Sequence, residues 1–331
     1  RADIALTNSI VRTLGEGDDD IVLNADSITL TTSELLAGID FGLGTRDSLG
    51  GTIVLDATGD IQLLTESIVT NDVLDDGRGQ SGDLLVRAEN LDLIDSLLRT
   101  AGFPRSSSAG NIVIDVANAI FTQANAVFFP VIASGDFFES LGRPGSITIN
   151  APQIRLEGGS LIETVTNNNP KIGNITITTE TLEVLEDSDI ATSVSRRGIG
   201  GDIQIQAMDI LLEGRGGDPS LRPLGIVTDV FLPRGGTGGD IVIDTENLTI
   251  IGSIVGADVF ADNSSGGDVT IRASNIVRLD GDEAAAADGF IGGGQISAVL
   301  RGRGGDEASF GGDILIEARQ LIVKDASLID A

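Results

Sequence analysis

The sequence predicts an all-β protein: a right-handed parallel β-helix, or β-solenoid, with three short strands per coil and about ten coils. Three observations predict it. A phrase of the form Gly-Asp-Ile-x-Ile-x-Ala recurs along the chain, apolar and polar residues alternate within each run, and the basic period is 28 residues. Because a solenoid lengthens by adding coils, residues 1–331 are interpreted as a single segment.

The first strand of each coil is the clearest part of the repeat. It reads GDIQIQA from Gly201, GDIVIDT from Gly239, GDVTIRA from Gly267 and GDILIEA from Gly312. The ten apolar anchors of this strand are Ile21, Ile53, Leu84, Ile112, Ile147, Ile175, Ile203, Ile241, Val269 and Ile314. Their intervals are 32, 31, 28, 35, 28, 28, 38, 28 and 45 residues, so the larger values indicate inserted loops.

A second and a third strand follow in each coil. The second has the form Ile-x-Leu, as in Ile154–Leu156, and the third has the form Ser-x-Ile-x-Thr. One coil buries too little apolar surface to offset the entropy of ordering its backbone, so coils are expected only in a stack, wound right-handed like other parallel crossovers. The inward hydroxyls of the third strand are expected to form a polar ladder: Ser160, Thr164, Ser188 and Thr192.

Composition excludes several functions. The chain has no His, Cys, Trp or Tyr, so a Ser-His or Cys-His nucleophile and a thiolate metal site are excluded. A net charge of −29 disfavours nucleic acid and anionic lipid as partners, because both require a positive surface. No apolar run approaches 18 residues, so no membrane span is expected.

The phrases Gly-Gly-Asp-Ile-x-Ile-x-Ala, Ile-x-Leu and Ser-x-Ile-x-Thr resemble the filamentous-haemagglutinin-like exoproteins of bacterial two-partner secretion, especially their cyanobacterial members. The resemblance covers nearly all of residues 3–331. It implies a secreted or cell-surface protein with a structural or adhesive role, whose partner is a surface or matrix component or a neighbouring copy. The family's secretion domain is missing, since Asn169-Pro170 alone does not match its signatures. With neither end resembling a cap, an internal fragment is expected.

Four aspartates follow the turn glycine in successive coils: Asp202, Asp240, Asp268 and Asp313. In a stack they lie one above another, and like charges so placed repel. Either a local hydrogen bond in each turn satisfies them, or cations such as Ca²⁺ lie between them. Earlier coils carry Asn111, Ser146 and Asn174 at this position, which favours the structural role. No other cofactor is expected.

The alternative function is a polysaccharide lyase or glycoside hydrolase, because parallel β-helices are hosts of both. Such an enzyme needs converging carboxylates, often with Arg or Lys, and usually aromatic rings that stack on sugars. The carboxylates here are mainly in turns, and no Trp or Tyr is present. A lateral groove with three or more close carboxylates, or with an Arg–carboxylate pair, would favour the enzyme; without one, a non-catalytic rod is expected.

Binding is expected at loops inserted at the coil corners, which lie side by side in a stack. They are Asp72–Ser81, Ala101–Ala109, Val131–Pro144, Arg215–Leu224, Asp229–Gly238, Asp258–Gly266, Asp282–Gly294 and Arg301–Gly311. Within Ala126–Pro144, four phenylalanines are the candidate binding residues: Phe128, Phe129, Phe137 and Phe138. Either their rings fold back on the solenoid flank, or they form an exposed apolar patch that contacts a partner.

Overall fold

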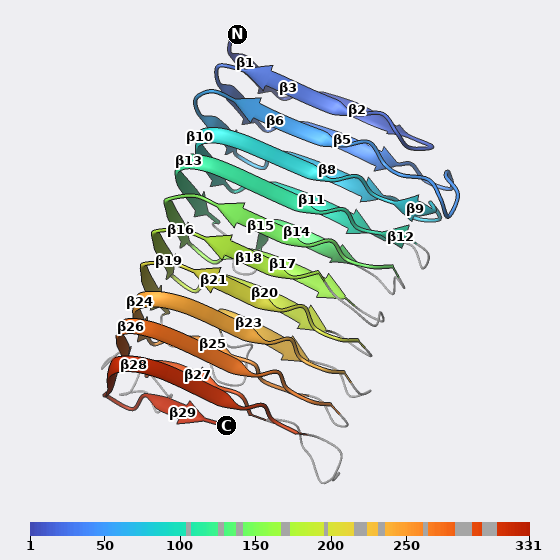
Figure 1. The fold of residues 1–331 in the computed structure, drawn as a ribbon. Helices are drawn as coiled ribbons and strands as arrows, with labels where there is room; N and C mark the ends of the chain where they lie inside the picture. Colours follow the sequence, from blue (N-terminus) through green and yellow to red (C-terminus); the bar gives the residue numbers. More distant parts are fainter. Residues whose placement is uncertain are drawn as a thin grey trace.

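The computed structural model describes residues 1–103, 107–124, 129–136, 142–166, 173–194, 198–214, 224–230, 236–260, 264–281, 293–299 and 310–331. Within these ranges all regular elements are β-strands. All pairings between named strands are parallel, and they form a 16-stranded sheet, an 11-stranded sheet and a two-stranded sheet. Figure 1 shows the strands stacked along one axis from the N-terminus to the C-terminus. The predicted all-β, parallel-strand architecture is therefore confirmed.

The 16-stranded sheet contains the first and second strands of the repeats. First strands that stand alone are β3 (Ile21–Ala25), β6 (Ile53–Ala57), β15 (Ile147–Asn150), β18 (Ile175–Thr178) and β21 (Ile203–Gln206). Second strands that stand alone are β1 (Ile4–Thr7), β4 (Ile28–Thr31), β7 (Ile61–Leu64), β16 (Gln153–Glu157), β19 (Thr181–Leu185) and β22 (Asp209–Glu213). Continuous strands are β10 (Leu84–Ile94), β13 (Ile112–Gln123), β24 (Ile241–Ile251), β26 (Val269–Asp280) and β28 (Ile314–Val323).

The 11-stranded sheet contains the third strand of each repeat. Its members are β2 (Ile10–Gly15), β5 (Glu34–Ile39), β8 (Ile68–Val73), β11 (Leu97–Gly102), β14 (Phe129–Asp136), β17 (Ser160–Thr166), β20 (Asp189–Val194), β23 (Gly225–Val230), β25 (Ile254–Gly256), β27 (Gln295–Ser297) and β29 (Leu328–Asp330). Two short strands, β9 (Gly79–Gln80) and β12 (Ser107–Ser108), form the two-stranded sheet.

The predicted anchor column is confirmed. Each of the ten anchors pairs in register with the anchor of the next repeat, from Ile21 with Ile53 to Val269 with Ile314. The first nine are buried, and Ile314 is partly buried against the same hydrophobic cluster. The variable intervals of the sequence therefore do not change the register, because the extra residues lie between strands.

The prediction of three separate strands in every repeat is only partly correct. In five repeats the first two strands are one continuous strand, with a register shift at the join, as between Ala88 and Asn90 of β10. Because β13 and β24 are continuous while the repeats between them are interrupted, the hydrogen-bonding path β13–β15–β18–β21–β24–β22–β19–β16 returns to β13 as a closed ring of eight strands.

Close backbone approach explains the glycine of the repeat phrase. A Cβ atom added to Gly239 would overlap the carbonyl oxygen of Gly201 in the repeat before it, and the same overlap would occur at Gly267 with Gly239. A side chain here would force neighbouring repeats apart, so the turn between the third and first strands requires glycine. This turn brings the candidate aspartates together.

Candidate functional site

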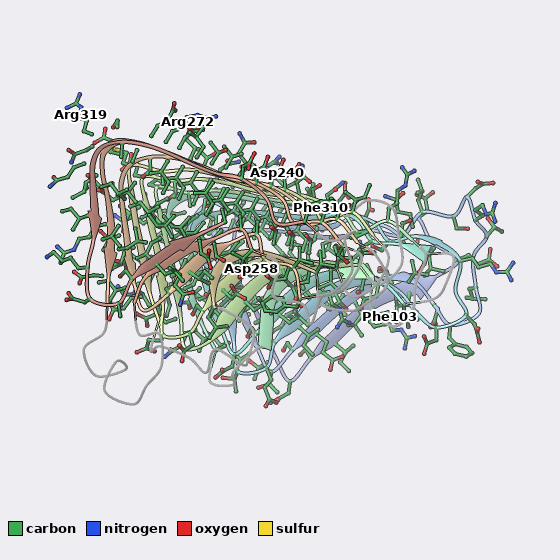
Figure 2. All side chains as sticks on the ribbon, turned by 90° about the horizontal axis from the view of Figure 1, so that it is seen from below. Phe103, Asp240, Asp258, Arg272, Phe310 and Arg319 are labelled. Carbon is green, nitrogen blue, oxygen red and sulfur yellow. The ribbon has the colours of Figure 1, made fainter. Side chains whose placement is uncertain are left out.

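The structure places the four candidate aspartates in one column and connects them. The backbone N–H of Asp240 donates to Asp202 Oδ1 (3.1 Å), that of Asp268 to Asp240 Oδ1 (2.9 Å) and that of Asp313 to Asp268 Oδ1 (2.8 Å). The side chains of Asp202, Asp240 and Asp268 thus each accept a hydrogen bond from the same position of the next repeat. Figure 2, seen along the stack, shows Asp240 and Arg272 along one side of the cross-section.

The same ladder continues through repeats that lack an aspartate. Asn174 Oδ1 accepts from Asp202 N (3.0 Å), Ser146 Oγ from Asn174 N (3.1 Å) and Asn111 Oδ1 from Ser146 N (2.9 Å). Asp, Asn and Ser all supply an oxygen acceptor, so they are interchangeable in this position. The hydrogen bond joins neighbouring repeats, whereas the sequence-based interpretation placed it within one turn.

The ladder defines what these residues do in the structure. One oxygen of Asp202, Asp240 and Asp268 is used to hold the next repeat, and all three side chains remain exposed. Within the described ranges, no three His, Cys, Asp or Glu residues are grouped so that they could hold a metal ion. Ca²⁺ in this column therefore stays a prediction for experiment.

The candidate phenylalanines fall largely outside the described residues. Phe128, Phe137 and Phe138 lie outside them, and for Phe129 the structure describes the backbone, which pairs with Ser160 as the first residue of β14. The predicted insertion Val131–Pro144 begins too early, because residues 131–136 belong to that strand. Pro and Gly are uncommon in strands, so Pro130 and Gly135 make the sequence of this strand look like a loop.

The predicted hydroxyl ladder of the third strand has a different pattern. Thr164 Oγ1 donates to the carbonyl oxygen of Gly173 (2.9 Å), and Thr192 Oγ1 to that of Gly201 (2.8 Å). Thr228 Oγ1 makes the same bond to Gly239 O (2.7 Å). The threonines thus fasten the end of one strand to the following glycine turn. Ser160 bonds locally to Glu157 O (2.7 Å), and the buried Ser188 hydroxyl has no hydrogen-bond partner among the residues that the structure describes.

Sequence reasoning missed a partly buried ion pair on the 11-stranded sheet. Arg99 donates from Nη2 to Asp72 Oδ2 (2.5 Å) and from Nε to Asp72 Oδ1 (3.3 Å), and its guanidinium lies 5.2 Å from the centre of the Phe103 ring. Burial raises the pKa of Asp72, and the Arg99 charge opposes this shift. The sequence predicts that Asp72 begins an inserted loop, but it belongs to β8 and is 3% exposed.

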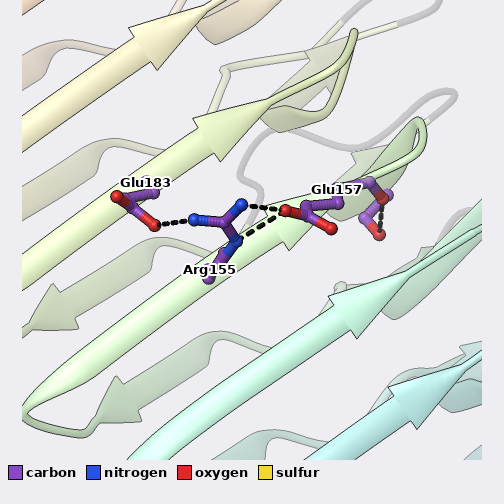
Figure 3. A network of polar contacts seen from close by, with 4 residues as sticks. Arg155, Glu157 and Glu183 are labelled. Carbon is purple, nitrogen blue, oxygen red and sulfur yellow. Dashed lines mark hydrogen bonds and ion pairs between the residues drawn. The ribbon is translucent and has the colours of Figure 1, made fainter.

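A second arginine cluster lies on the second strands of two neighbouring repeats (Figure 3). Arg155 donates from Nε to Glu157 Oε1 (2.5 Å) and from Nη1 to Glu183 Oε2 (2.6 Å), and these bonds raise the pKa of its guanidinium. Arg155 and Glu157 border a cavity of about 310 Å³ that Glu186 and Glu213 also line. This is the Arg–carboxylate pair that would favour an enzyme.

A larger groove of about 970 Å³ runs along the corner between first and second strands. It holds Arg87 and the carboxylates Glu89, Asp115 and Glu180. Glu89 and Glu180 lie three repeats apart, which at about 4.8 Å per strand is about 14 Å. The three carboxylates therefore do not all converge on one point.

The comparisons with known proteins add no relative: no family model, no curated protein and no solved structure matches this chain. Within the described residues, no helix is long and apolar enough to cross a membrane.

Proposed function

We propose that this chain is a non-catalytic structural or adhesive rod: a right-handed parallel β-helix of about ten coils, secreted or displayed on the bacterial cell surface. In this proposal it is a repeat segment of a filamentous-haemagglutinin-like exoprotein. Its partner is a cell-surface or matrix component or a neighbouring copy, reached through the loops at the coil corners.

The observation that carries the proposal is the use of polar side chains between repeats. The turn acceptors of Asn111, Ser146, Asn174, Asp202, Asp240 and Asp268 each bind the backbone of the following repeat. Side chains that each use an oxygen to hold the next repeat extend and stabilise a stack, as a structural rod requires. Such a molecule suits a spacer or scaffold.

Adhesion through the Phe-rich insertion is tested by the double variant Phe137→Ser/Phe138→Ser. If the insertion contacts a partner, binding to intact source cells or to their matrix falls while the melting temperature is unchanged. If the rings instead pack on the solenoid flank, the melting temperature falls and binding is retained. Wild-type values for both properties would remove this segment from the proposal, and failure of the wild-type protein to bind would remove adhesion altogether.

A second candidate function is supported by the Arg155 cluster. A guanidinium beside Glu157 and Glu183, bordering a cavity with two further glutamates, has the composition of a polysaccharide lyase or glycosidase site. Release of reducing ends or unsaturated products from neutral and acidic polysaccharides measures this activity. Turnover that Arg155→Gln abolishes would establish the enzyme and overturn the non-catalytic proposal, whereas no turnover on either class supports the rod.

A further inference from the structure

The corner groove, lined by residues between Ala57 and Glu180, has a regular arrangement of polar side chains that the rod function does not require. One wall is formed by Arg87, Asp115, Asn150 and Thr178, which follow one another in register on successive strands. The other wall is formed by Glu89, at the register shift within β10, and by Pro152 and Glu180, which follow β15 and β18. The lining covers five successive repeats, so the groove is about 19 Å long at about 4.8 Å per strand.

Small side chains create the groove. The corner positions of the five repeats are occupied by Ala57, Ala88, Val116, Ala151 and Thr179, all of which are nearly buried. Because these side chains are short, the corner is concave instead of filled. In the next repeat the turn position after Ala207 is held by Met208, a larger side chain that is 48% exposed, and the lining ends before it.

The polar groups of the groove include donors and acceptors that still have bonding capacity. Asp56 is engaged by Arg1 (3.3 Å) and Asp115 accepts from Asn150 Nδ2 (2.8 Å), so Arg87 has no ion-pair partner within the described part of the chain. The carboxylate of Glu180 likewise makes no hydrogen bond to any described residue. A donor thus lies toward one end and an acceptor toward the other, with an amide–carboxylate pair between them.

We propose that this groove binds a linear, uncharged polysaccharide chain lying along the stacking axis. A hydroxyl group both donates and accepts, so a polyol can bond Arg87 and Asn150 as acceptor and Glu180 as donor. Three carboxylates against one guanidinium, in a chain of net charge −29, repel a polyanion. A polycation would be repelled by Arg87. Two of the carboxylates that could attract it already accept hydrogen bonds, Asp115 from Asn150 and Glu89 from Asn118.

The register of the groove favours a repeating ligand. Its wall positions recur once per strand, and each holds a polar side chain, so equivalent hydroxyls of successive sugar units can each meet a hydrogen-bonding group. No aromatic ring lines the groove, so each contact is a hydrogen bond of modest net strength, made directly or through water. Binding to a single short oligosaccharide is therefore weak, and a long chain is required for measurable retention.

The test is affinity electrophoresis of the full chain in gels that contain a neutral polymer (dextran, galactomannan or hydroxyethyl cellulose), polygalacturonate or no polymer. We expect retardation in at least one neutral gel, with an apparent dissociation constant that rises about tenfold in Asp115→Ala/Asn150→Ala. The matched control is Gln206→Ala/Asp244→Ala, which changes the net charge equally and lies in the same outward column beyond the groove.

The proposal would be overturned by no retardation in any neutral gel, by an equal loss in the control variant, or by stronger retardation in polygalacturonate than in the neutral gels. Retention of binding by the groove variant would also overturn it. Because none of these readouts involves cells or product release, the outcome does not depend on whether the chain is a surface rod or an enzyme.

Discussion

The two large sheets differ in how far the residues on their outward sides are buried. In the 16-stranded sheet, strands such as β18 alternate strictly between buried and more exposed residues, so one side faces the core and the other faces solvent. In the 11-stranded sheet, all six residues of β20 and of β23 are buried. Outward residues of β20 and β23, Ala191 and Val227, pack in a hydrophobic cluster separate from the main core.

This difference in burial indicates which polar groups contribute most to the stability of the fold. The exposed side of the 16-stranded sheet holds ion pairs such as Arg155–Glu183 in contact with water, where each is worth little. On the 11-stranded sheet a carboxylate such as Asp72 is removed from water and must be compensated. Equal chemical changes on the two sheets should therefore have unequal effects on stability.

The largest effect is expected for Arg99→Met. It removes the partner of a buried carboxylate and should lower the free energy of unfolding at neutral pH by about 3–5 kcal/mol, measured by urea denaturation. Asp72→Asn/Arg99→Met, which removes the charge as well, is the control and should recover most of the loss. Equal losses in the two variants would show that packing, and not charge, is responsible.

The pH dependence of that variant follows from the raised pKa of Asp72. A carboxyl whose pKa is higher in the folded state than in the unfolded state costs stability as pH rises, because the unfolded chain then releases the proton more readily. Without Arg99 the pKa rises further. The deficit of Arg99→Met relative to wild type should therefore shrink as pH falls toward the ordinary aspartate pKa, and a deficit that is constant with pH would contradict the assignment.

A smaller effect is expected inside the stack. Thr192→Val retains the shape of the side chain but removes the hydroxyl that donates to Gly201 O, leaving a buried carbonyl unsatisfied. The unfolding free energy should fall by about 1–3 kcal/mol. Thr176→Val on the outward side of β18 is the matched control and should change stability by no more than about 0.5 kcal/mol.

The turn ladder should respond more weakly because it is exposed. Asp240→Ala removes the acceptor for Asp268 N and should cost about 0.5–1.5 kcal/mol, whereas Asp240→Asn keeps an oxygen acceptor and should be nearly neutral. If the column is only turn chemistry, a chelator leaves the melting temperature unchanged. A large rise of melting temperature with Ca²⁺ would instead establish a cation site, because a ligand of the folded state stabilises it.

The smallest effect is expected for Arg155→Gln on the solvent-facing side. Its bonds to Glu157 and Glu183 are half exposed, so the loss should be at most about 1 kcal/mol and should diminish in high salt. Thermal unfolding at low and high salt measures it. A loss as large as that of Arg99→Met would end the distinction between the two sheets.

Much of the fold could be predicted because the sequence patterns that specify it lie within single strands and turns. Alternation and the Gly-Asp phrase identified the anchor column from Ile21 to Ile314, and insertions did not disturb it. The merging of strands at Ala88–Asn90 was not predictable, since it depends on a register shift between neighbouring strands. The pair Asp72–Arg99 joins residues 27 positions apart, and the corner groove combines residues of five repeats, so no local pattern reveals either of them.

Disulfide trapping tests the central claim, that each repeat stacks in register on the one before it, most directly, because the chain has no native cysteine. Thr176 and Gln204 are in-register neighbours, and Thr148 lies one repeat further away. At about 4.8 Å, the Cα separation of Thr176→Cys/Gln204→Cys suits a disulfide, whereas twice that distance in Thr148→Cys/Gln204→Cys does not. We expect rapid oxidation of the first pair and almost none of the second within one chain, and equal or reversed yields would contradict in-register stacking.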